Sequence, residues 1–100
     1  MHRTRMAEMP SLMDAIEKQL QEERAATLGK AGKEVETALR ELDTGVAGVS
    51  EDELLDAAGT KVWYYLITRE SCGMYDHKEA LAIYGVPDRV IARVGVVRRR

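Results

Sequence analysis

Residues 11–42 read SLMDAIEKQLQEERAATLGKAGKEVETALREL, and this stretch decides the fold of the chain. Its apolar side chains recur three or four residues apart, a spacing that places them on one face of an α-helix. They are Met13, Ile16, Leu20, Leu28, Ala31, Val35, Ala38 and Leu42. Ser11 precedes them as a potential N-cap. Arg24 stands where the next apolar residue is expected, so the pattern indicates a helix, or two, of a globular protein and not a sustained coiled coil.

Two glycines leave open whether this segment is one helix or two. Gly29 and Gly32 each destabilise a helix interior by about 1 kcal/mol relative to alanine, and they could mark a break at which the chain folds back. The helical spacing nevertheless continues beyond both glycines, at Ala31 and Val35. One helix over residues 11–42 would be about 48 Å long at ~1.5 Å per residue. It would project from a domain of this size, whose radius of gyration is about 13 Å.

A projecting helix with an apolar stripe predicts self-association. The stripe would extend past the body of the domain and would need cover. A second copy of the same helix is the simplest cover, because most soluble oligomers are symmetric homo-oligomers. Small residues at helical spacing would let two backbones approach closely. We therefore expect a homodimer, with a broken helix and a monomer as the alternative, and an interface at Ala25, Leu28, Gly29, Gly32 and Val35.

A second long helix follows a glycine-containing loop over residues 43–50. Ser50 and Glu53 form the pattern of a capping box, which predicts a helix over residues 51–71. Its run VWYYLI is apolar on nearly every side. We expect this run to lie at the centre of the core, with Trp63 as its largest contributor.

Two short helices close the chain. Gly73 is predicted to end the second helix, Asp76 to cap HKEALAIY, and Gly85 to end it. Pro87 then opens PDRVIARV at a position where a first-turn proline is tolerated. The predicted fold class is all-α, an irregular helical bundle with a long N-terminal helix, a buried second helix and two short C-terminal helices.

The composition bounds the class of protein. Hydrophobic residues make up 45% and charged residues 32%, which is typical of a soluble globular chain. We expect one domain over residues 1–100, with a flexible start at 1–10 and a basic tail at 96–100. A single cysteine suits a reducing compartment. No apolar leader and no run of ~20 apolar residues is present, so a cytoplasmic location without a membrane is expected.

The segment ESCGMYDH, residues 70–77, concentrates chemically reactive side chains. A thiol enzyme would need Cys72 as a thiolate beside a base such as His77. The C-terminus of a helix disfavours a thiolate, and helix stopping and capping already account for Gly73 and Asp76. One cysteine and two histidines are too few for a tetrahedral metal site. No catalytic residue, metal or cofactor is therefore predicted.

Residues 77–95 contain EALAIYGVPDRVIARVG, which resembles the helix-turn-helix of bacterial DNA-binding proteins. The pattern departs from that motif at Leu81, where a small side chain is preferred, and Asp88 places a negative charge at the end that would approach the bases. The second helix is also short. DNA binding is the alternative function, and its contacts would come from arginines, namely Arg89, Arg93 and Arg98.

The order of elements carries one further resemblance. A long acidic helix, a tryptophan-bearing helix and the pattern YDHKEAL…YGVP…ARVG together resemble small uncharacterised bacterial helical proteins. The resemblance implies a helical fold and no particular activity. We expect a non-enzymatic interaction or structural module that self-associates through its first helix.

Overall fold

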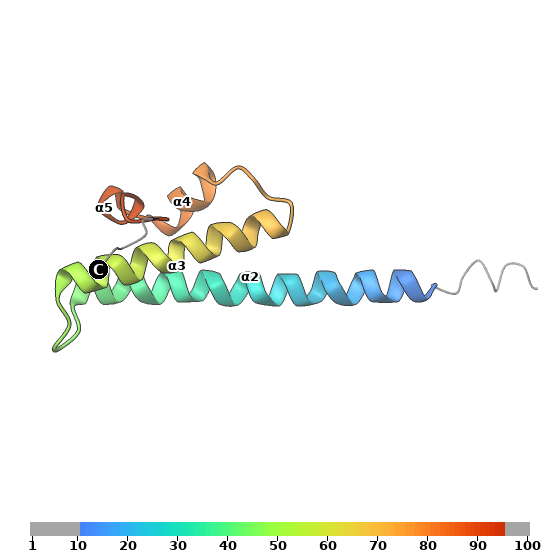
Figure 1. Cartoon of the computed structure of the whole chain (residues 1–100), viewed down its shortest axis with the longest axis horizontal. Coiled ribbons are helices and arrows are strands. Elements are labelled where there is room, and N and C mark those ends of the chain that lie inside the picture. Colours follow the sequence, from blue (N-terminus) through green and yellow to red (C-terminus); the bar gives the residue numbers. More distant parts are fainter. Residues whose placement is uncertain (1–10, 96–100) are drawn as a thin grey trace, which may run out of the picture.

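The computed structural model describes residues 11–95, so the flexible start predicted at 1–10 and the basic tail predicted at 96–100 lie outside the described residues. This part of the chain folds into four α-helices, with no strand, and Figure 1 shows their arrangement. They are α2 (Leu12–Thr44), α3 (Glu51–Ser71), α4 (Lys78–Tyr84) and α5 (Asp88–Ile91). The all-α class and the predicted order of one long, one intermediate and two short helices are confirmed.

The first helix is a single unbroken rod. α2 continues through Gly29 and Gly32 for 33 residues. Ser11 caps its start, with its hydroxyl oxygen accepting a hydrogen bond from the backbone N–H of Asp14 at 3.0 Å. Gly45 ends it, donating its N–H to the carbonyl of Glu41 at 2.7 Å. The alternative of a helix broken at the two glycines is therefore wrong.

α2 and α3 form an antiparallel hairpin (Figure 1). The connecting loop is tight, with an isolated bridge between Val46 and Val49. Ser50 and Glu53 make both bonds of the predicted capping box, at 3.1 Å from the Glu53 N–H to the Ser50 hydroxyl and 2.9 Å from the Ser50 N–H to the Glu53 carboxylate. This local chemistry fixes where α3 begins and so how far it runs back along α2.

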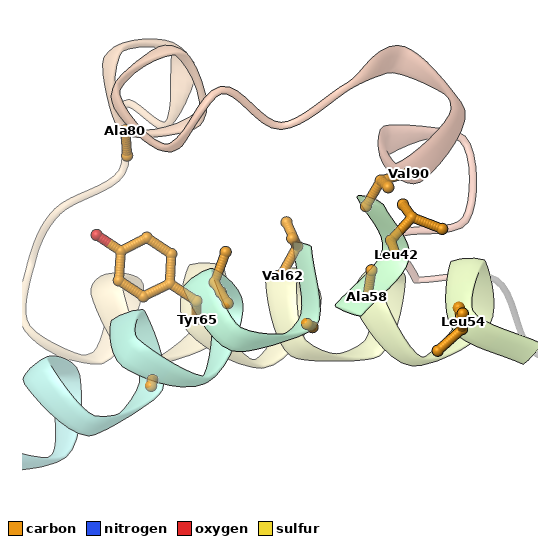
Figure 2. Packing of buried hydrophobic residues seen from close by; sticks show 10 residues of the cluster. Leu42, Leu54, Ala58, Val62, Tyr65, Ala80 and Val90 are labelled. Carbon is orange, nitrogen blue, oxygen red and sulfur yellow. The ribbon is translucent and has the colours of Figure 1, made fainter. Parts of the chain in front are cut away.

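The core lies between the second half of α2, one side of α3, and the two short helices (Figure 2). Its members are small or of medium size: Ala31, Val35, Ala38, Leu42, Leu54, Ala58, Val62, Tyr65, Ala80 and Val90. The expectation that Trp63 would contribute most is wrong, because its side chain is 45% exposed. Val62 takes the buried position, and Trp63, one residue further on, is rotated about 100° away from it.

The short helices are joined to α3 by helix-ending turns that the sequence predicts. The N–H of Met74 bonds the carbonyl of Arg69, and Gly73 has the positive φ that such a turn requires. Gly85 ends α4 in the same way. α4 begins one residue later than predicted, with His77 as its N-cap. The Asp76 carboxylate nevertheless accepts a hydrogen bond from the backbone N–H of Lys78 at 3.2 Å.

Candidate functional site

The first half of α2 has no cover from the rest of the described chain. Every residue from 12 to 27 is exposed, and the buried residues of α2 lie between Ala31 and Leu42. Figure 1 shows the reason: α2 runs well past the end of α3. We call residues 12–27 the overhang.

The overhang carries an exposed apolar stripe. Four large side chains form it, and their exposure ranges from 77% at Leu12 to 43% at Leu20, with Met13 and Ile16 between them in sequence. Met13 lies eighteen residues before Ala31, and Leu20 eighteen residues before Ala38. Eighteen residues make five turns of an α-helix, so Met13 and Leu20 lie on the face of α2 that is buried further along, and Ile16 and Leu12 lie beside that face.

The predicted dimer residues fall mostly where α2 is already packed. Val35 is 1% exposed, and a methyl group on Gly32 would collide with the hydroxyl of Tyr84 from α4. Leu28 is half-buried against the core, while Ala25 and Gly29 are exposed. The exposed apolar surface therefore lies nearer the start of the helix than the predicted patch. The sequence does contain this surface, because Met13, Ile16 and Leu20 are the first residues of the predicted apolar stripe.

Two of the three arginines predicted to contact DNA, Arg89 and Arg93, are engaged within the chain. Arg93 donates to the carboxylates of Asp56 at 2.6 Å and Asp52 at 2.9 Å, and these hydrogen bonds raise the pKa of Arg93. Arg89 pairs with Glu51 at 2.7 Å. These ion pairs hold the segment from residue 89 to residue 93 against the first turns of α3, and their carboxylates would repel a phosphate. Arg98 lies outside the described residues.

The reactive side chains of ESCGMYDH are arranged as a helix junction. Cys72 is the C-cap of α3. His77 instead bonds two neighbours on α3: its Nδ1 accepts from Arg69 Nε at 3.3 Å, and its Nε2 lies 2.9 Å from Glu70 Oε2. The first bond assigns the proton to Nε2, which then donates to Glu70. Within residues 11–95 no three His, Cys, Asp or Glu side chains are grouped as metal ligands would be.

A hollow of about 310 Å³ lies between α3 and α4. Tyr65 and Tyr84 wall it, with their rings edge to face at a centroid distance of 5.2 Å. Arg69 lies 5.9 Å over the ring of Tyr65 and donates to the backbone carbonyl of Asp76 at 2.8 Å. These contacts join the two helices and account for the arrangement without a ligand.

None of the described helices is both long enough and apolar enough to span a membrane.

The comparisons with known proteins place the chain in a family. Neither the curated proteins nor the solved structures gave a match. Residues 5–100 match the model of a family of unknown function, DUF6665. This match confirms the expected resemblance to an uncharacterised family, and the chain therefore belongs to the family of unknown function DUF6665.

Proposed function

We propose that the protein is a non-enzymatic interaction module that binds a second copy of itself through the overhang. The observation that carries the proposal is the exposed apolar stripe on a helix half in which every residue is exposed. Helices as long as α2 gain most of their stability from packing an apolar face. A face of this kind therefore favours a partner.

The size of the stripe sets the expected strength of the association. Full burial of a leucine, isoleucine or methionine contributes about 1.5–3 kcal/mol. Each copy offers four such side chains, of which Ile16 and Leu20 are partly covered already. Association itself costs about 4–15 kcal/mol in lost freedom of motion. In a dimer, full burial of all eight side chains would contribute at most about 12–24 kcal/mol, which can offset this cost, so association at micromolar concentration is expected.

DNA is not proposed as the partner. Arg89 and Arg93 bond the carboxylates of α3, and the chain carries a net charge of −2. Binding to phosphates needs arginines that can neutralise them and so release the counterions condensed on the DNA.

The cytoplasmic location expected from the single cysteine and the absence of a long apolar run stays a prediction.

Light scattering coupled to size-exclusion chromatography tests the proposal. At micromolar concentration we expect a mass near twice the 11.2 kDa of one chain, with dissociation on dilution. A mass of one chain throughout the micromolar range would contradict the proposal.

A matched pair of variants locates the interface. Ile16→Glu places a charge on the stripe, and we expect it to yield a monomer. Ile83→Glu makes the same change at an exposed isoleucine of α4, away from the overhang, and should leave the dimer intact. Glutamate is at least as good a helix former as isoleucine, so neither substitution lowers the intrinsic helix propensity at its position, and circular dichroism should show a folded helical chain in both. Equal effects of the two variants would contradict an interface on the overhang.

A further inference from the structure

We infer that two copies pair antiparallel, overhang against overhang, with Leu20 of each copy facing Leu20 of the other across a two-fold axis. The inference rests on the proposed self-association and specifies its geometry. Three features of α2 carry it. They are the face that the stripe shares with the core, the point along the helix at which burial begins, and the position of Arg24.

The shared face sets the direction of the partner. Two residues of the stripe, Met13 and Leu20, lie on the same side of α2 as Ala31 and Ala38, which are buried against the rest of the molecule. α3 occupies the space along that side. A parallel partner helix that started on the overhang would run on into this space and collide with α3. An antiparallel partner runs the other way, and its own body lies beyond the start of the first copy's helix.

The point at which burial begins along α2 sets the register. The first residue of α2 that is half-buried is Leu28. A partner helix that begins at Leu12 covers the whole overhang when its Leu12 lies opposite Leu28 of the first copy. The centre of that pairing is Leu20, midway between residues 12 and 28. This register places every residue of the stripe within the length covered by the partner helix.

Arg24 fits this register, although it interrupts the apolar stripe. Pairing centred on Leu20 brings together residues whose numbers add to about 40. Arg24 then lies opposite Ile16, over which its aliphatic stem can pack. Its guanidinium reaches Glu17 of the other copy, because residues 17 and 24 lie two turns apart on one flank of the helix. The two-fold axis produces this ion pair twice, and such pairs set orientation more than affinity.

Charge reversal tests the ion pairs. Glu17→Arg and Arg24→Glu each create two repulsive contacts, and we expect each to weaken the dimer about tenfold or more. The double variant restores both pairs in reversed order, so its dissociation constant should return to near that of the original chain. Glu22→Arg is the matched control, since residue 22 lies on the opposite side of the helix. A double variant no tighter than the single ones would overturn the inference.

A distance measurement tests the direction independently. Spin labels at Glu41→Cys, in a chain whose own cysteine is replaced by Cys72→Ser, report the separation of the two bodies. Antiparallel pairing centred on Leu20 places the labelled backbones about 60 Å apart at ~1.5 Å per residue. Side-by-side parallel helices would place them within about 20 Å. A dimer with the short distance would overturn the inference but not the proposed function, whereas a monomeric original chain would overturn both.

Discussion

At the scale of single residues, three helical glycines that look alike in the sequence have different surroundings. An added Cβ at Gly29 would meet nothing within 4 Å. At Gly32 it would meet the Tyr84 hydroxyl, and at Gly59 it would lie 2.7 Å from the Cβ and 2.8 Å from the carbonyl oxygen of Arg93. The missing side chain at Gly59 therefore lets the backbone at Arg93 pack closely against α3. Gly29 only weakens its helix.

This contrast predicts opposite effects of the same substitution. Gly29→Ala should raise the free energy of unfolding by about 0.5–1 kcal/mol, because alanine is the better helix former and has room. Gly59→Ala should lower it by about 1–3 kcal/mol, because backbone atoms must move. Urea denaturation monitored by circular dichroism measures both. Gly29→Ala should also leave the dimer intact. If this variant were monomeric, the interface would instead lie at the small-residue patch around Ala25 that the sequence predicts.

Tyr84 makes the fold sensitive to alkaline pH. Burial, followed by the hydrogen bond with Tyr65, raises the pKa of Tyr84 above its usual value of 10.0. The folded state thus holds the phenolic proton more tightly than the unfolded state does. The resulting stabilisation is fully present below about pH 10 and is lost as the pH rises through the raised pKa.

Tyr84→Phe tests this dependence, because it removes the titrating group. We expect the free energy of unfolding to fall less steeply above about pH 10 in the variant than in the original chain. Tyr75→Phe serves as the control, since Tyr75 is exposed. Parallel declines in all three proteins would show that Tyr84 does not titrate with the fold.

At the scale of elements, the ends of the helices could be predicted and their buried sides could not. The capping box at Ser50 and the stops at Gly73 and Gly85 depend on residues next to each other in the chain, so the sequence contains all of their chemistry. The buried side of α3 depends on which helices pack on it. The run VWYYLI is apolar all round, and only the neighbouring helices select Val62 over Trp63.

The two serine caps should differ in their effect on stability. Ser50→Ala should lower the free energy of unfolding by about 1 kcal/mol, because it removes a cap from a helix whose every turn packs on the core. Ser11→Ala removes a similar bond from the overhang, in which every residue is exposed. When Ser11→Ala is combined with the monomeric variant Ile16→Glu, we expect faster hydrogen exchange in residues 12–20 and an unchanged free energy of global unfolding. Equal losses of global stability would mean that the overhang is coupled to the core.

At the scale of the whole molecule, the overhang makes the protein elongated. The radius of gyration is 19.3 Å, against about 13 Å for a compact chain of this length. The length of α2 and its projection were predictable from the apolar spacing. The position of the candidate surface was not, because Gly32 and Val35 are covered through tertiary packing, and a collision with Tyr84 from a distant segment cannot be read from local pattern.

The division of α2 into a packed half and an overhang predicts that the overhang can be removed without unfolding the rest. A chain of residues 27–100 keeps every buried residue of α2, and Thr27 is itself a residue type that caps helix starts. It should unfold cooperatively, with a free energy of unfolding within about 1 kcal/mol of full-length Ile16→Glu. That variant is the proper reference, because dimerisation makes the stability of the original chain depend on concentration. The shortened chain should also have the mass of one copy at every concentration at which the original chain is a dimer. If it unfolds, the overhang stabilises the core in a way that its exposed side chains do not explain, and if it remains a dimer, the interface lies elsewhere.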